Sequence, residues 1–152
     1  MGGIDNTQPF LTPLKIIEQA QGGVMHGIKA SDHSFAGFGE AYFSTVNFGL
    51  IKGWKLHRKM TLNLVVPSGE IRFVVHSASE NYTGRDVVPV LDVILGSTQY
   101  SRLTVPPGYW VAFEGVGRER NILLNVADIE HEPSEAINYP LDFFRVPNFH
   151  QF

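Results

Sequence analysis

The sequence predicts an all-β fold, a sandwich or closed barrel of the jelly-roll kind, on three observations. Fifteen Gly and nine Pro residues, together with 12% aromatic residues, favour short strands and many turns over a helix bundle. Apolar or alternating segments recur at short intervals, separated by turns that contain Gly or Pro. Two tight corners, at 66–70 and 103–113, are flanked by alternating strands, as in a jelly roll whose interior holds a small ligand.

The elements follow one another in a regular order. The segment 14–20, LKIIEQA, fits either a short helix ended by two glycines or a first strand, because its adjacent isoleucines are β-branched. VPSGE at 66–70 resembles a hairpin turn, and the aromatic, Pro-broken end of the chain suits a tail laid across the body. Nine further strands are predicted at 24–30, 40–47, 50–57, 59–66, 70–77, 87–95, 100–105, 109–114 and 121–128.

Length and composition limit the classes of protein. The 152 residues fit one domain, and 43% hydrophobic with 18% charged residues excludes wholesale disorder. The formal charge of −3 gives no general attraction to nucleic acid or anionic membrane, so an anion-binding site must be local. Without cysteine there is no disulfide and no thiolate chemistry. No apolar run approaches the ~20 residues of a membrane span, and the start MGGIDNTQPF lacks the pattern of a secretory signal, so a cytoplasmic location is expected.

The segment 52–63, KGWKLHRKMTLN, places polar side chains in one register of a strand and mostly apolar side chains in the other. Successive side chains on a strand point to opposite faces, so the polar set shares one surface. That surface either lines a pocket or faces water, because alternation alone does not say which face is inside. The polar register contains Lys55, His57, Lys59, Thr61 and Asn63.

Four short stretches resemble the dTDP-4-dehydrorhamnose 3,5-epimerase family of cupins. They are GLIKG at 49–53, SGE at 68–70, VPPGYWVAF at 105–113 and HEPSE at 131–135. The spacing from Lys55 to Gly69 is also similar to that of the sister sugar-nucleotide 3,4-ketoisomerases. The likeness covers roughly residues 24–142.

The resemblance implies a cupin-type double-stranded β-helix that forms a homodimer and binds a nucleoside-diphosphate 4-keto-6-deoxy sugar. It implies no metal and no other cofactor, and a place in surface-polysaccharide precursor synthesis such as that of O antigen. It divides the single domain 1–152 into an N-terminal arm (1–23), a barrel (24–142) and a C-terminal tail (143–152). In the family, a His removes a proton beside the ketone and a Tyr opposite returns one to the other face.

The chain departs from the family at the residues that carry this chemistry. The catalytic His falls on Lys55, while the second His of the ketoisomerase signature is kept as His57. The signature Arg is Lys52, which keeps the charge but loses the planar fork that grips phosphate. The catalytic Tyr falls on Asn125, so both partners of the acid–base pair are replaced.

The polar register offers a substitute for the missing pair. Removing a proton beside a ketone needs a base and a group that holds the developing enolate oxygen. Clustered cations lower one another's pKa, so Lys55 is a candidate base, with His57 or Lys59 on the enolate; alternatively Lys55 stays charged and holds the carbonyl or a phosphate. In this hypothesis Thr61 and Asn63 extend the row and Lys52 serves the phosphates. Lys55 also interrupts the His-x-His pair that a metal-binding cupin needs, which argues against a metal.

Other polar and aromatic residues are candidates with an ordinary structural alternative. Asn125 fits a hydrogen bond to a sugar hydroxyl or a strand-end role. Asp142 fits a partner for His57 or Lys55, or a surface carboxylate. Trp110 fits stacking on a nucleotide base or core packing. The remaining candidates for substrate contacts are Tyr42, Ser44 and His131.

The interpretation of the sequence is therefore a cupin that epimerises or isomerises a nucleotide-linked keto sugar by enolate chemistry. The alternative is a non-catalytic cupin that binds a nucleotide sugar or a protein partner, which the loss of the family His and Tyr favours. A buried cationic row favours catalysis, because buried charges persist only with a partner or a task. Neither interpretation involves nucleic acid or a membrane.

Overall fold

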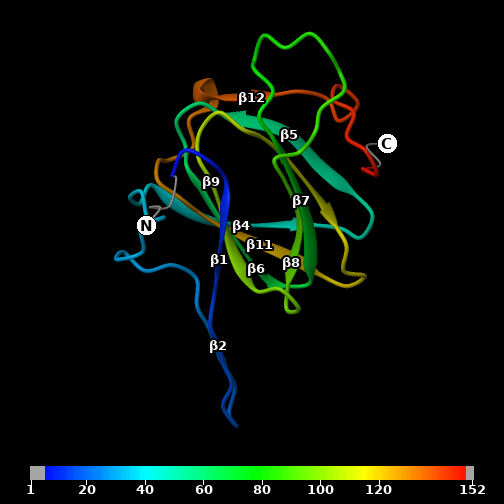
Figure 1. Ribbon diagram of the computed structural model, residues 1–152. Helices are drawn as coiled ribbons and strands as arrows, with labels where there is room; N and C mark the ends of the chain where they lie inside the picture. The colour runs from blue at the N-terminus through cyan, green and yellow to red at the C-terminus, as the bar shows by residue number, and fades with distance from the viewer. Residues whose placement is uncertain (1–5, 150–152) are drawn as a thin grey trace, which may run out of the picture.

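A computed structural model describes residues 6–149 as two five-stranded antiparallel sheets packed face to face, with the chain crossing repeatedly between them (Figure 1). The strands are β1 (Phe10–Pro13), β2 (Ile16–Ile17), β3 (Val24–Met25), β4 (Glu40–Val46), β5 (Ile51–His57), β6 (Leu62–Ser68), β7 (Glu70–His76), β8 (Leu91–Gly96), β9 (Ser101–Val105), β10 (Trp110–Gly115), β11 (Asn121–Ala127) and β12 (Ala136–Asn138). One short 3₁₀ helix, η1 (Pro133–Glu135), precedes β12.

The strand order is that of a jelly roll. The first sheet runs β1-β9-β6-β11-β4 and the second runs β12-β5-β10-β7-β8, while β2 and β3 form a separate two-stranded ribbon. From β4 to β7 and again from β8 to β12, each strand lies in the opposite sheet from the strand before it. The predicted all-β, cupin-type double-stranded β-helix is therefore confirmed. The expected hairpin at 66–70 is wrong, because β6 and β7 lie in different sheets and the turn is a corner between them.

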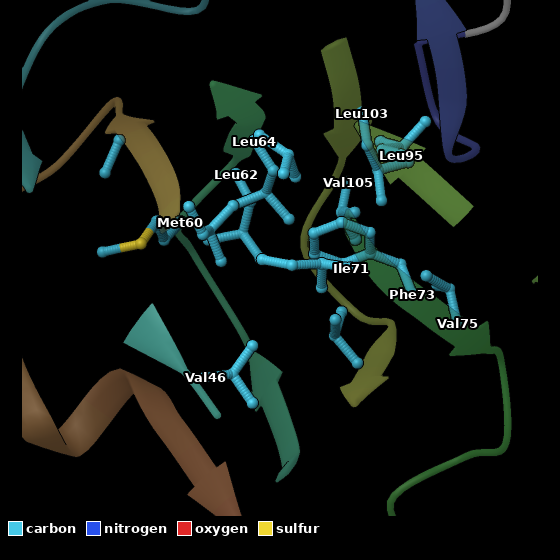
Figure 2. Close-up of a cluster of buried hydrophobic side chains, with 14 residues drawn as sticks. Val46, Met60, Leu62, Leu64, Ile71, Phe73, Val75, Leu95, Leu103 and Val105 are labelled. Atoms are coloured by element: carbon cyan, nitrogen blue, oxygen red, sulfur yellow. The ribbon is translucent and has the colours of Figure 1, made fainter. Parts of the chain in front are cut away.

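The main hydrophobic core lies between the two sheets. Figure 2 shows its side chains converging from strands of both sheets, with Leu62 and Leu64 facing Ile71 and Phe73. These positions alternate along each strand, which is why one register of β6, β7 and β9 is apolar. The buried members are Val46, Met60, Leu62, Leu64, Val66, Ile71, Phe73, Val75, Leu95, Leu103, Val105, Val111, Leu123 and Ala127.

A second, aromatic cluster covers the outer face of the second sheet. Trp54 and Trp110 on neighbouring strands pack against Phe144 of the C-terminal segment, with ring centroids 5.7 and 5.2 Å away. The C-terminal segment therefore lies across the body up to residue 149; the last three residues of the expected tail lie outside the described residues.

The structure differs from the predicted strands mainly at their ends. Residues 14–20 contain strand β2 rather than a helix, and the expected strand 24–30 is only Val24–Met25. The expected strand 59–66 begins at Leu62, because the N–H groups of residues 59, 60 and 61 donate to carboxylates instead of joining a ladder. Strands β1 and β12 were not predicted, and β1 brings part of the N-terminal arm to the edge of the first sheet.

The ribbon of β2 and β3 projects away from the two sheets (Figure 1). Ile16, Ile17, Val24 and Met25 on this ribbon are all exposed, Val24 by 50%. Within the described part of the chain, there is no helix whose length and apolar character would let it cross a bilayer.

Candidate functional site

A cavity of about 350 Å³ opens between the two sheets, a volume within the range of small-molecule sites. The first sheet contributes residues of β4, β6 and β11, and the second contributes residues of β5 and β10. Asn138, the last residue of β12, and Tyr139, the next residue, complete the lining. The lining residues are Tyr42, Ser44, Lys52, Gly53, Trp54, Lys55, His57, Leu62, Leu64, Val111, Phe113, Leu123, Asn125, Asn138 and Tyr139.

Strand β5 turns its polar register toward this cavity. Trp54 and Leu56 are buried in the aromatic cluster on the outer face of the second sheet. Because side chains alternate along a strand, Lys55 and His57 point to the inner face, and both line the cavity. Burial of one large indole thus fixes the direction of two functional side chains.

A β-bulge adds Lys52 to the same wall. On a regular strand Lys52 and Lys55 would point to opposite faces, because they are three residues apart. In the pairing with β10, Lys55 lies opposite Val111 and Lys52 opposite Phe113, so two β5 residues oppose the single residue Ala112. The extra residue restores Lys52 to the cavity side.

His57 is bonded to a buried carboxylate. Its Nδ1 lies 2.5 Å from Oε1 of Glu135, and the two residues are only 8% and 3% exposed. The other carboxylate oxygen, Oε2, accepts hydrogen bonds from the N–H groups of Lys59 and Met60 at 3.0 and 3.3 Å. These bonds hold Glu135 in one place at the end of η1.

The charge state of this carboxylate follows from its partners. Burial alone raises the pKa of Glu135, but the hydrogen bond from His57 and two backbone N–H groups outweigh burial and hold the pKa below its ordinary value. Glu135 is therefore ionised at neutral pH and only accepts hydrogen bonds. Nδ1 of His57 must then carry a proton, which leaves Nε2 as the basic nitrogen of the neutral ring.

The wall of the cavity is cationic. It contains Lys52 and Lys55 and no carboxylate, since Glu135 lies behind His57 and is not part of the lining. Among the described residues, neither lysine forms an ion pair with a carboxylate. A molecule of formal charge −3 thus has a local site for an anion.

The opposite wall carries a phenol and an amide. Tyr42 on β4 pairs directly with Asn125 on β11 in the first sheet, and Nδ2 of Asn125 donates to the hydroxyl oxygen of Tyr42 at 3.0 Å. Lys55 and His57 are on the second sheet, across the cavity. A ligand between the sheets therefore meets cations and imidazole on one side and the phenol on the other.

Comparison with known proteins shows the family. No family model matches the sequence, and no curated protein matches it. Among solved structures, a dTDP sugar isomerase from Desulfovibrio desulfuricans G20 is 32% identical, with a TM-score of 0.81, over 94% of this chain and 90% of that one. The chain belongs to the dTDP-sugar isomerase family. The resemblance found in the sequence is thereby confirmed, and a nucleotide-sugar isomerase or epimerase role follows at the level of the family.

Two more distant structures share the fold of this dTDP-sugar isomerase family member. The dTDP-6-deoxy-D-glucose-3,5-epimerase of Legionella pneumophila Philadelphia 1, in complex with dTDP-4-keto-L-rhamnose, is 16% identical over 90% of this chain and 74% of that one, with a TM-score of 0.72. A sugar 3,4-ketoisomerase of Thermoanaerobacterium thermosaccharolyticum, in complex with TDP, is 17% identical over 86% and 87%, with a TM-score of 0.67.

The structure brings half of the predicted site residues of this family member together. Three come from β5 and form one wall of the cavity, while two from β4 and one from β11 belong to the facing wall. These residues are Lys52, Lys55, His57, Tyr42, Ser44 and Asn125.

The predicted row does not continue beyond His57. Strand β5 ends there, and Lys59 is exposed in the turn that follows. Thr61 also lies in that turn, where its N–H donates to Asp128. Asn63 is buried on β6, in the register opposite Leu62 and Leu64, and bonds to protein groups. The expectation that Lys59, Thr61 and Asn63 line the cavity is therefore wrong, because the chain leaves the sheet between 58 and 61.

Three other predicted residues also lie elsewhere. Trp110 is fully buried in the aromatic cluster, so it does not offer a face to a nucleotide base. His131 is exposed ahead of η1, outside the cavity lining. Asp142 is exposed, and the partner expected of it is taken by Glu135.

Sequence reasoning missed Glu135, Asn138 and Tyr139. The HEPSE stretch that carries Glu135 resembles the family, but nothing in the stretch indicates which of its carboxylates turns inward. Asn138 is the last residue of β12 and pairs with Lys55, and Tyr139 follows it directly. Among residues 6–149, no group of three or more His, Cys, Asp or Glu residues is placed to hold a metal ion.

Proposed function

We propose that this member of the dTDP-sugar isomerase family epimerises or isomerises a nucleoside-diphosphate 4-keto-6-deoxy sugar by enolate chemistry. One observation carries the proposal: a His–carboxylate pair, 2.5 Å apart, at the wall of a cationic cavity. The arrangement provides a base whose tautomer is fixed and whose protonated form is stabilised by the adjacent negative charge. A base held at the wall of a cavity can act on a bound ligand, which favours catalysis over binding alone.

His57 is the base in this mechanism. A ketone at C4 acidifies the protons on the neighbouring carbons C3 and C5, and Nε2 of His57 removes one of them. The electron pair of the broken C–H bond moves to the carbonyl oxygen and forms an enolate. The resulting imidazolium keeps its Nδ1 proton and donates a hydrogen bond to Glu135. The ionised carboxylate stabilises the positive charge of the ring. This assignment replaces Lys55, the base expected from the sequence.

Lys55 holds the developing enolate oxygen. It lies two residues before His57 on the same face of β5, and its ammonium group places a positive charge and hydrogen-bond donors inside the cavity. A charged Lys55 therefore fits the second of the two roles that the sequence left open. Lys52, at the more exposed end of the same wall, provides a second cation for the pyrophosphate.

Tyr42 returns a proton on the opposite face of the sugar ring. It is the phenol on the first sheet, and His57 lies on the second, so the two groups approach a bound ring from opposite sides. Removal on one face and return on the other inverts the carbon. If the proton returns to C4 instead of C3, and the hydroxyl proton on O3 moves to O4, the carbonyl moves from C4 to C3. Ser44 and Asn125 line the same wall as hydrogen-bonding groups.

The proposal includes a homodimer, for which the projecting ribbon of β2 and β3 is the support. A two-stranded ribbon in water is marginally stable on its own, and this ribbon exposes all four of its strand side chains, which are apolar. Packing against a second copy would bury them. We expect native protein to sediment at about twice its 16.9 kDa mass and Ile17→Asp to sediment as a monomer. Gln21→Asp, with the same new charge at the exposed turn, should remain a dimer; a monomeric native protein would contradict the proposal.

The setting proposed for this reaction is surface-polysaccharide precursor synthesis in the cytoplasm, as the resemblance of the sequence implies. The nucleotide-sugar class is supported by the cationic wall and by the sugar-nucleotide enzymes to which the chain is similar.

The experiment is deuterium uptake from heavy water. Native protein is incubated with a panel of nucleoside-diphosphate 4-keto-6-deoxy sugars and with the matching 4-hydroxy sugars, which lack the acidified protons. NMR and mass spectrometry then locate deuterium on the ring. Uptake at C3 or C5 of a keto sugar, with none in its hydroxy counterpart, is the expected result. Binding by calorimetry without uptake on any keto sugar would instead identify a non-catalytic binding protein.

A further inference from the structure

The side-chain amide of Asn125 is held in one orientation by a donor that cannot be reversed. The backbone N–H of Asn63 donates to Oδ1 of Asn125 at 3.1 Å. A backbone N–H only donates, so the group that faces it must be the oxygen of the amide and not its nitrogen. The Nδ2 end therefore faces Tyr42, 3.0 Å away. Asn125 is 2% exposed, so no solvent competes for these bonds.

Asn63 is itself fixed from both ends. Its Nδ2 donates to the carbonyl oxygen of Ser34 at 3.0 Å, and its Oδ1 accepts from the hydroxyl of Thr104 at 2.7 Å. Ser34 is anchored in turn by the buried guanidinium of Arg102, which donates to its hydroxyl at 2.8 Å. Because both ends of the buried Asn63 amide are bonded, its side chain is held in one place, and so is the backbone N–H of the same residue.

This polarity decides where the proton of Tyr42 points. A phenol has one O–H donor, and its oxygen here already accepts the N–H of Asn125. The O–H is therefore free to point away from the amide, and Tyr42 is 39% exposed and lines the cavity. We infer that Asn63 and Asn125 are positioning residues that direct the hydroxyl proton of Tyr42 to the ligand. This inference rests on the proposed function and specifies how its proton donor is prepared.

The hydrogen bond from Asn125 also stabilises the negative charge that proton transfer leaves on Tyr42. The O–H bond of Tyr42 breaks, its proton goes to the enolate carbon, and the electron pair stays on the phenolic oxygen. The N–H of Asn125 already points at that oxygen and stabilises the tyrosinate as it forms. After the product leaves, the proton that His57 took from the sugar passes through water to the tyrosinate, which restores both groups. An amide in the reverse orientation would accept the phenol proton instead and withhold it from the sugar.

The test reverses the direction of the hydrogen bond between residue 125 and Tyr42 by replacing the amide of Asn125 with a carboxylate. In Asn125→Asp, one carboxylate oxygen still accepts from Asn63, but the other replaces Nδ2 and can only accept, so it draws the proton of Tyr42 away from the ligand. We expect product formation to fall by about 100-fold or more, within the range of a lost general acid. Deuterium uptake catalysed from the His57 side should fall by less than about tenfold, because the enolate still forms and is reprotonated on the same face.

A double-mutant cycle separates polarity from the new negative charge. Asn125→Asp in a Tyr42→Phe background carries the same charge but has no phenol proton to redirect, so we expect a further change of less than about threefold. Native product formation in Asn125→Asp, an equal loss of uptake and product, or an equal loss in both backgrounds would overturn the inference alone. A native protein without uptake on any keto sugar would overturn the proposed function and the inference with it.

Discussion

At the scale of single residues, the site depends on a pair that is 78 positions apart in the sequence. Alternation along 52–63 places His57 on the same face as Lys55, and the structure turns that face toward the cavity. It does not indicate that Glu135 reaches the imidazole, because that contact requires η1 to lie across the end of β5. The sequence therefore predicts the wall of the cavity, but not which of its groups is the base.

A second histidine, His76, is buried without charge and makes stability depend on pH. It lies among Trp54, Trp110 and Phe144, and burial lowers its pKa from 6.5 to about 4. The unfolded chain therefore binds more protons than the folded chain between these values, so stability is full above pH 6.5 and falls as the pH drops toward 4. By about pH 5 we expect a loss of about 2 kcal/mol of unfolding free energy from this residue.

Urea unfolding at about pH 7.5 and about pH 5 measures this loss. His76→Asn is the matched variant, because its side-chain oxygen replaces the Nδ1 atom that accepts from the N–H of Ala78 and it does not titrate. The drop in unfolding free energy between the two pH values should be smaller in His76→Asn than in the native protein. Equal drops in the two proteins would show that His76 is not the group responsible.

At the scale of elements, strand β5 connects the aromatic cluster to the cavity. The indole of Trp54 is fully buried on the outer face. If the two registers of the strand exchanged faces, Lys55 and His57 would be buried among aromatic rings instead, at a large cost in desolvation. Because of this cost, alternation predicts correctly which residues of β5 face the cavity, once one face of the strand is known to be apolar and covered. The sequence predicts that the C-terminal tail lies across the body, but it does not indicate that Phe144 covers this particular face.

The bulge at Gly53 is the element that aligns Lys52 with Lys55. Gly53 has φ of +138°, and a Cβ there would lie 2.7 Å from the Cβ of Ala112. Gly37 has a similar φ of +121°, but an added Cβ would meet nothing within 4 Å. Both alanine variants therefore carry about 1–2 kcal/mol of backbone strain, and Gly53→Ala adds about 1–3 kcal/mol from the clash.

Thermal and urea unfolding of Gly53→Ala and Gly37→Ala compare the two costs directly. The greater destabilisation of Gly53→Ala should be accompanied by weaker binding of a nucleoside diphosphate, since the bulge directs Lys52 to the cavity. If the two variants were equally stable and bound the nucleotide equally well, the prediction that close packing at Gly53 positions Lys52 would be wrong.

The end of β5 also shows where sequence periodicity stops being informative. In the sequence, the polar and apolar alternation continues through Lys59, Thr61 and Asn63. In the structure, the N–H groups of residues 59 to 61 bond to the carboxylates of Glu135 and Asp128. Side-chain acceptors far away in the sequence compete with the strand ladder there. A period of two in the sequence cannot report such competition, so three of the five residues in the predicted row lie outside the cavity.

At the scale of the whole molecule, the two clusters have different tasks. The core between the sheets closes most of the barrel, while the outer aromatic cluster holds the second sheet against the C-terminal segment. The space left between the sheets takes both of its lysines from one strand of the second sheet and the phenol of Tyr42 from the facing sheet. Composition and turn residues predict this two-layer architecture, because it needs only many short alternating strands. The sequence does not predict the strand order, which depends on pairings such as β12 with β5.

Deuterium uptake at C3 or C5 of a nucleoside-diphosphate 4-keto-6-deoxy sugar, compared between His57→Asn and His131→Asn, tests the central claim most directly. Both variants replace an imidazole by an amide, but only His57 lines the cavity and bonds to Glu135. The account predicts a loss of uptake of about 100-fold or more in His57→Asn and native uptake, within about threefold, in His131→Asn. Undiminished uptake in a folded His57→Asn, together with its loss in Lys55→Met, would contradict the account and assign the base to Lys55.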